Sequence, residues 1–400
     1  MEQIRKRVPE KLLYVGILLY TLERCWNASL ILPYNTNVDE VLKISVALMM
    51  VLAIFRQSFT PKMYLIYGLA AVGAAAIRLR TGLMLDVFTL LMILVCREAD
   101  LTRVVNIIRR TTTVFLLAHT LYFFCLLLLG KQELFYVEWG GRVRARFGLL
   151  GPNLVSSYFF NLVLMWAWEK YDMVRLKQLV WILVLATVLF RFTDSRTAYF
   201  CTVALCLLLI LLKHSRFAEK CVNFIAAWCA PALGLLVLAG SYHWRNGFFS
   251  ILNRLLSDRI KLSAYGIANF GFTLFGQKVD YSTIIDPEKW NIFYMPTFTF
   301  DCVYSYLWSN IGIIWLVLIC LCFFFLARRK NPRFSLCLIF WALYGMCEVT
   351  VMSIVRFFPL LLISSIFLSK QEFDRLYGPQ SAMDTTDHPI ERGVEQNAAN

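Results

Sequence analysis

Long apolar segments separated by short charged loops run through most of this 400-residue chain, and they constrain its fold more than any other feature. An α-helix needs about 20 apolar residues to cross a hydrocarbon core of about 30 Å. Charged residues make up only 16% of the chain, whereas soluble domains average about 25%. The pattern therefore predicts an all-α polytopic membrane protein with about 12 transmembrane helices. The predicted spans are 12–32, 41–55, 63–77, 82–96, 112–130, 149–168, 178–191, 197–212, 221–240, 302–326, 335–348 and 351–369.

Residues 241–301 are a long polar and aromatic interruption of this apolar pattern. Lys and Arg are more frequent in the short loops on one side of the predicted spans, and the positive-inside rule makes that side cytoplasmic. The sequence thus predicts a membrane domain over 1–369 with both termini cytoplasmic and with 241–301 as a large extracytoplasmic loop. Residues 370–400 are polar and are predicted to form a disordered cytoplasmic tail.

The cations of the short outer loops are nearly all arginine, with Lys131 as the exception. The topology rule disfavours cations on this side, so their presence needs a cause. Arginine has a planar fork of donors that matches phosphate and carboxylate groups. The arginines therefore predict an anionic, phosphate-bearing ligand at the outer face. The alternative is that they pair with lipid headgroups or with loop carboxylates such as Glu133, Glu138 and Asp194.

The sequence contains no recognisable motif for metal or nucleotide binding. The cysteines lie in or beside apolar segments, no Cys or His group has metal-ligand spacing, and nucleotide-binding and serine-hydrolase motifs are absent. The sequence predicts no metal site, no cofactor and no nucleic-acid partner.

Three local motifs accompany the outer arginines. The first is a basic loop that leads into a Pro152-Asn153 helix start, and the second is the tight turn Phe192-Thr-Asp-Ser-Arg-Thr197. The third lies in the large loop, where Ser-Asp258-Arg259 is followed by Phe275-Gly276 and then by an Asp–x–x–Tyr sequence before an apolar span. The residues singled out in these motifs are Arg142, Arg144, Arg146, Asn153, Arg196, Arg254, Arg259, Asp301 and Tyr304.

Together these motifs resemble those of the O-antigen and capsular polysaccharide polymerase family (Wzy-like oligosaccharide repeat-unit polymerases), which is related to the O-antigen ligases. The resemblance covers roughly residues 140–330 and the general pattern of spans. The ligases usually have a histidine near the end of the large loop. This chain has Asp301 at the corresponding place, which favours a polymerase.

The resemblance implies a metal-independent glycosyltransferase of the cytoplasmic membrane. Such an enzyme moves a glycan from one undecaprenyl pyrophosphate carrier onto the terminal sugar of another lipid-linked repeat unit. Its expected partners are the lipid-linked oligosaccharides, the lipid bilayer, a flippase and chain-length regulators.

The implied reaction assigns roles to particular residues. Arg196 and Arg259 would hold the pyrophosphate, and Asp301 would be the general base for the acceptor hydroxyl. Glu348 and His243 are the next candidates for the base. The remaining predicted residues would contact substrate, and an aromatic run would stack on sugar rings; these residues are Arg142, Arg144, Arg146, Asn153, Arg254 and Tyr304, with Trp290, Phe293, Tyr294, Phe298 and Phe300 in the run.

Other interpretations remain open at this point. Asp301 is equally placed to be the N-cap of the following helix, and Glu348 to pair with Arg356. The whole chain has the alternatives of a ligase, a precursor transporter or flippase, and a structural or sensory membrane protein. A transporter is expected to show internal repeats and broken helices, and the sequence indicates neither.

Overall fold

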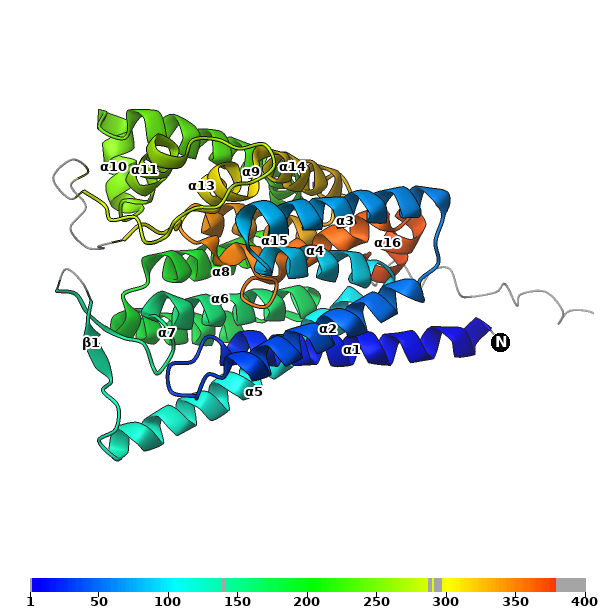
Figure 1. The fold of residues 1–400 in the computed structure, drawn as a ribbon, viewed down its shortest axis with the longest axis horizontal. Coiled ribbons are helices and arrows are strands. Elements are labelled where there is room, and N and C mark those ends of the chain that lie inside the picture. The colour runs from blue at the N-terminus through cyan, green and yellow to red at the C-terminus, as the bar shows by residue number, and fades with distance from the viewer. Residues whose placement is uncertain (1, 139–140, 287–289, 291–296, 379–400) are drawn as a thin grey trace, which may run out of the picture.

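The computed structural model describes residues 2–138, 141–286, 290 and 297–378, and these residues are mostly helical. Figure 1 shows a bundle in which most helices run along one common direction. The helices of the N-terminal part are α1 Glu2–Trp26, α2 Thr36–Phe55, α3 Pro61–Thr81, α4 Leu85–Val95 and α5 Leu101–Leu128. A short antiparallel hairpin follows, made of β1 Phe135–Val137 and β2 Val143–Ala145.

The second part of the chain adds four long helices and then shorter ones. These are α6 Pro152–Glu169, α7 Leu176–Thr193, α8 Arg196–His214, α9 Arg216–His243, α10 Gly247–Leu255, α11 Arg259–Phe270, α13 Val303–Tyr306, α14 Ile313–Ala327, α15 Pro332–Gly345 and α16 Lys370–Tyr377. Short 3₁₀ segments are Cys96–Glu98, Tyr171–Met173, Val349–Met352 and Phe358–Phe367, and a π-helical turn spans Leu307–Ile311.

Five helices of the described part are long and apolar enough to cross a membrane, namely α3, α5, α7, α8 and α9. Their apolar side chains are largely exposed, as at Leu69 of α3, Leu121 of α5 and Leu235 of α9. Exposed apolar surface of this extent is rare on soluble monomers, and lipid is the environment that suits it. These helices therefore indicate an all-α membrane protein.

The predicted span 302–326 is not one helix. It is interrupted by the π-helical turn and by Gly312, whose φ is +121°, and α14 begins only after that residue. The predicted span 82–96 is also shorter than expected, because α4 covers only 11 residues.

The predicted span 351–369 is wrong as an α-helix, because the segment is a buried run of 3₁₀ turns and extended residues. Its backbone bonds to other parts of the chain. The Asn161 side-chain amide donates to the Val355 carbonyl oxygen at 3.0 Å, and the Phe358 N–H donates to Asn161 Oδ1 at 3.2 Å. Irregular backbone survives in such a position only when protein groups satisfy it.

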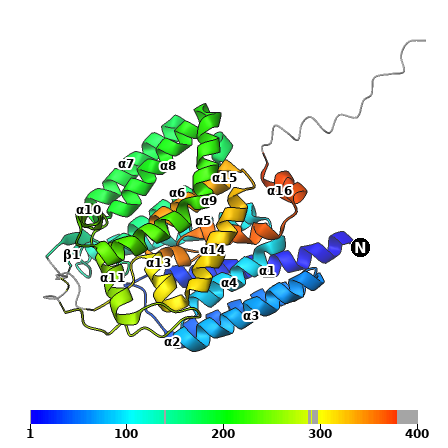
Figure 2. The same ribbon diagram turned by 90° about the horizontal axis from the view of Figure 1, so that it is seen from above.

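The polar tail begins later than predicted. Lys370–Tyr377 forms α16, which has a Ser369–Glu372 capping box and packs Phe373 and Tyr377 against Phe334. The expected disorder from 379 onward lies outside the described residues. Figures 1 and 2 place α16 and the N-terminus at one end of the bundle, and α10 and β1 at the other end.

Candidate functional site

A cavity of about 730 Å³ opens at the end of the bundle opposite α16. The α7–α8 turn, the α10–α11 turn, the residues before α13 and the end of α15 surround it. Its mouth is lined by charged residues and its floor by apolar side chains of α8 and α15, including Phe200, Ala204 and Phe340. Such a cavity suits a ligand with a charged part and an apolar part.

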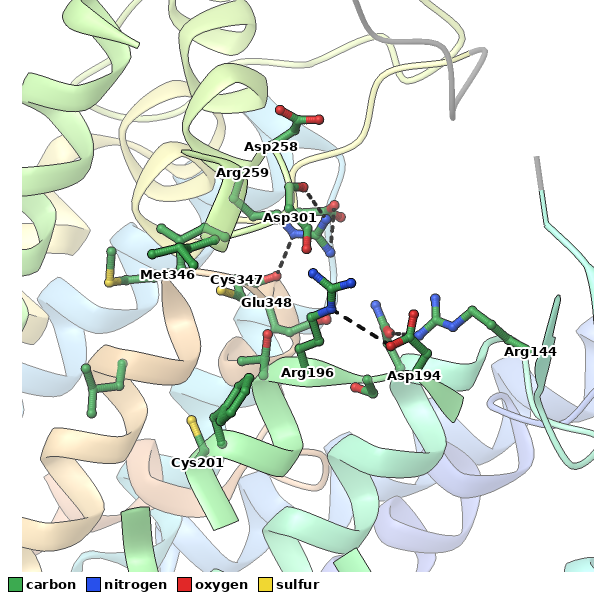
Figure 3. A pocket seen from close by; sticks show the side chains of 18 of the residues that line it. Arg144, Asp194, Arg196, Cys201, Asp258, Arg259, Asp301, Met346, Cys347 and Glu348 are labelled. Carbon is green, nitrogen blue, oxygen red and sulfur yellow. Dashed lines mark hydrogen bonds and ion pairs between the residues drawn. The ribbon is translucent and has the colours of Figure 1, made fainter. Parts of the chain in front are cut away.

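Most of the site residues predicted from the sequence line this cavity, although they are far apart in the chain. They are Arg142, Arg144, Asn153, Arg196, Arg259, Asp301 and Glu348. Figure 3 shows Arg196 and Arg259 on different elements, both reaching into the region above Glu348.

One wall of the cavity is the turn between α7 and α8. Asp194 ends α7 in the left-handed conformation with φ +46°, and Ser195 occupies the N-cap position of α8 without a side-chain cap. Asp194 pairs with Arg142 and, at 3.9 Å, with Nε of Arg196. The Arg196 side chain is 55% exposed, so it can turn toward a ligand with little loss of internal contacts.

Arg144, on β2, has a different environment, because it is buried and its guanidinium donors are occupied. It bonds to the Thr193 carbonyl oxygen, to both oxygens of Glu138 at 3.0 and 3.1 Å, and to Oδ1 of Asn153. Asn153 follows Pro152 in the first turn of α6, as the sequence predicts. The geometry makes Arg144 a residue that positions Asn153 and the hairpin.

The opposite wall contains Arg259, the first residue of α11. Its Nη2 lies 3.3 Å from Oδ2 of Asp301, and its Nη1 donates to the Ser257 carbonyl oxygen at 3.0 Å. Its Nε also reaches the carbonyl oxygen of Cys347 at 3.4 Å. Ser257 and Asp258 have positive φ, which turns the chain sharply before α11 and directs Arg259 into the cavity.

Asp301 is not the N-cap of the next helix. That position belongs to Cys302, which makes no side-chain cap bond, and α13 begins at Val303. The Asp301 carboxylate instead forms an ion pair with Arg259 at the cavity mouth (Figure 3).

Glu348 lies in the loop after α15, outside the five apolar helices. Burial raises the pKa of its carboxyl group to about 7; Arg259 and Arg144 oppose this shift, and the nearby Asp301 adds to it. A hydrogen bond with Asn153 also favours the ionised form. The groups that act on Glu348 are therefore these neighbours and not Arg356, the partner considered from the sequence.

Four predicted site residues lie away from the cavity. Arg146 stacks on the Tyr136 ring, 4.7 Å from its centroid, and Arg254 is exposed on α10. His243 belongs to the last turn of α9, where it is exposed and stacks on Phe249. Tyr304 is fully buried in the bundle and donates to the Ala342 carbonyl oxygen at 3.0 Å.

The aromatic residues before α13 also have a different environment from the one predicted. Phe298 and Phe300 are buried and pack against Phe270, so they offer no open face to a sugar. Trp290 stacks with Trp244. Phe293 and Tyr294 lie outside the described residues.

Several cavity residues were missed by the sequence analysis as site residues. Glu138 and Asp194 were considered only as partners for loop arginines, and both do pair with arginines here. Asp258 lies beside the chosen Arg259 and lines the cavity, a position that its adjacency in the motif already suggested. The apolar floor on α8 and α15 could not be recognised from the sequence, because each of its residues belongs to an ordinary apolar helix.

Within the described ranges, no group of three or more His, Cys, Asp or Glu side chains is arranged to hold a metal ion. Comparison of the chain with known protein families, curated proteins and solved structures finds no match. The resemblance to the polysaccharide polymerases therefore stays a prediction.

Proposed function

We propose that this protein is a glycosyltransferase of the cytoplasmic membrane that joins lipid-linked oligosaccharide repeat units into a surface polysaccharide. The proposal includes about 12 membrane segments, cytoplasmic termini and an extracytoplasmic 241–301 region. The observation that carries it is the convergence of Arg142, Arg196, Arg259, Asp301 and Glu348 in one cavity at the end of the bundle opposite the N-terminus and α16.

The amphipathic cavity supports a lipid-linked pyrophosphate as the substrate. In the proposed reaction, Arg196 and Arg259 bind the pyrophosphate of the donor, with Arg142 beside them. The acceptor hydroxyl oxygen forms the new glycosidic bond, the bond from the donor sugar to the pyrophosphate breaks, and the carrier lipid leaves as its pyrophosphate. The arginines stabilise the negative charge that develops on this leaving group.

The hydroxyl proton passes to a carboxylate of the cavity. Asp301 is the proposed base, because Arg259 holds its carboxylate at the cavity mouth. Glu348 is the second candidate, since a carboxyl group with a pKa of about 7 is suited to exchange a proton at neutral pH. Both residues are at the same cavity, so one set of variants can decide between them.

Transport of a lipid-linked precursor is the second candidate function, and a specific observation favours it. The α-helical path is interrupted between Leu307 and Gly312, and the substrate sites of transporters are often formed at interrupted helices. The charged cavity, however, is lined by other elements. O-antigen ligase activity would use the same cavity with a different acceptor.

The function is tested with the purified protein in proteoliposomes that contain the source cell's own lipid-linked oligosaccharides. We expect a ladder of longer glycans on a gel. Arg196→Ala should reduce its rate by about 10²-fold or more, as for loss of a donor to a developing negative charge. Arg196→Lys should rescue poorly, because the bidentate fork is lost.

Arg103→Ala is the matched control, because Arg103 is an exposed arginine near the start of α5 at the other end of the bundle. It should leave the ladder unchanged. A full ladder with Arg196→Ala would contradict the proposed site. Movement of the lipid across the bilayer without any new glycosidic bond would establish the transporter instead.

A further inference from the structure

Helix α10 exposes a continuous apolar face at the cavity end of the bundle. Phe248, Ile251 and Leu255 are 66%, 61% and 69% exposed, and their spacing of three and four residues puts them on one side of the helix. Arg254 is exposed at the edge of this side. A helix of this pattern is typical of segments that lie along a membrane surface.

The opposite face of α10 is held by hydrogen bonds and packing contacts with the rest of the protein. Asn253 is buried, donates to Oδ1 of Asp258 at 2.7 Å and accepts from the backbone N–H of Lys261 at 2.9 Å. Phe249 packs toward Gly240 and His243 of α9. The orientation of α10 is therefore set by internal contacts, and the apolar face points outward as a consequence.

The outward face continues the exposed apolar surface of α9, which is long and apolar enough to cross a membrane. Leu235 and Tyr242 of α9 are 67% and 62% exposed, and α10 begins after only a short turn (Figure 1). In that turn, Arg245 stacks on Trp244, 4.8 Å from the ring centroid. Aromatic residues are enriched where a helix leaves the hydrocarbon core, and basic side chains near the membrane surface are attracted to anionic headgroups.

We propose that α10 lies in the lipid–water interface of the bilayer that α9 crosses. Phe248, Ile251 and Leu255 enter the boundary between headgroups and acyl chains, and Arg245 and Arg254 contact anionic headgroups. Leu255 and Leu256 also line the cavity, so the cavity mouth is held at the level of the membrane surface. This inference concerns the membrane contact alone and does not depend on the chemistry at the cavity.

The test is a spin-label measurement on the full-length protein in bilayers that contain anionic lipid. A genetically encoded keto amino acid carries the label, so that the native cysteines stay in place. Labels are put at Phe248, Ile251 and Leu255, with the exposed Leu235 of α9 as the lipid reference and the exposed Ser282 as the water reference. The accessibilities to oxygen and to a water-soluble nickel chelate are then compared.

We expect the labels at Phe248, Ile251 and Leu255 to be more accessible to oxygen than to the nickel chelate, close to the ratio at Leu235. A high nickel accessibility at all three positions, like that at Ser282, would overturn the proposal by placing α10 in water. Exclusion of both reagents would also overturn it, because a second copy or another protein would then cover the face. All labelled sites are exposed, so a monodisperse preparation is sufficient to show that folding is intact.

Discussion

Arg144 and Arg196 both belong to the arginine-containing sequence motifs, but their environments in the structure differ. Arg144 is buried and bonded to Thr193, Glu138 and Asn153, whereas Arg196 is half-exposed with one long ion pair. A buried charge that loses its partner is costly, and an exposed ion pair contributes little to stability. Arg144 is thus needed to build the site, and Arg196 is available to bind at it.

At the same scale, the rate of glycan transfer tests whether Glu348 or Asp301 is the base. If Glu348 is the base, its carboxyl group must be deprotonated, so the rate of glycan transfer rises as the pH passes through about 7. Glu348→Gln should then lower the rate by about 10²–10⁴-fold and remove this rise. Asp301→Asn should cause that loss if Asp301 is the base, as the sequence predicts, and single repeat units should accumulate.

The measurement is the initial rate of the proteoliposome reaction from pH 5.5 to 8.5 for the parent protein and both variants. A near-normal rate in Asp301→Asn, together with a lost pH dependence in Glu348→Gln, would move the base from Asp301 to Glu348. Near-normal rates in both variants would exclude Asp301 and Glu348 as the base.

At the scale of elements, the break between Leu307 and Gly312 is held by an extended segment that is more than thirty residues away in the chain. The Thr273 N–H donates to the Trp308 carbonyl oxygen at 2.9 Å, and the Ile313 N–H donates to the Thr273 carbonyl oxygen at 2.8 Å. The Gln277 N–H bonds to Asn310 in the same way. The backbone groups that the break frees are therefore satisfied within the protein.

Gly312→Ala should destabilise this element. A Cβ at Gly312 would lie 2.4 Å from the Leu274 carbonyl oxygen, and its φ of +121° is strained for any residue with a side chain. The backbone conformation alone costs about 1–3 kcal/mol, and the clash adds to this cost. The thermal unfolding midpoint of the purified protein in detergent is the measurement, and we expect it to fall.

The matched control is Gly68→Ala in α3, where a Cβ meets no atom within 4 Å. This change should leave the unfolding midpoint unchanged or raise it, because alanine favours the helix by about 0.5–1 kcal/mol. An unchanged midpoint in Gly312→Ala would show that the close contact with the 273–277 segment does not form.

At the scale of the whole molecule, the N-terminus and α16 lie at one end of the bundle, and the α10–α11 turn that lines the cavity lies at the other end (Figure 2). With the proposed orientation, a cysteine placed at the exposed Ser282 should react with a membrane-impermeant maleimide in intact cells. A cysteine at the exposed Lys177, at the start of α7, should react only after permeabilisation. The parent protein provides the background from its native cysteines, and labelling of Ser282 only after permeabilisation would reverse the orientation.

The sequence alone indicated an all-α membrane protein and the charged residues that line its cavity. Hydropathy depends on local composition, so it located the apolar helices α3, α5, α7, α8 and α9. The largest difference is at α5, which begins at Leu101 and not at 112, because its first turns carry charged residues. The scarcity of charges elsewhere made the arginine-rich loops conspicuous, and most of the predicted residues do meet in one cavity.

Only the tertiary structure decided which of those residues are available and which helices are interrupted. Tyr304 is a core residue because α9 and α15 close around it, with Gly234 and Ala342 as its neighbours. The segment 351–369 is irregular because distant groups such as the Asn161 amide satisfy its backbone. Both outcomes depend on partners far away in the chain, and local composition carries no information about such partners.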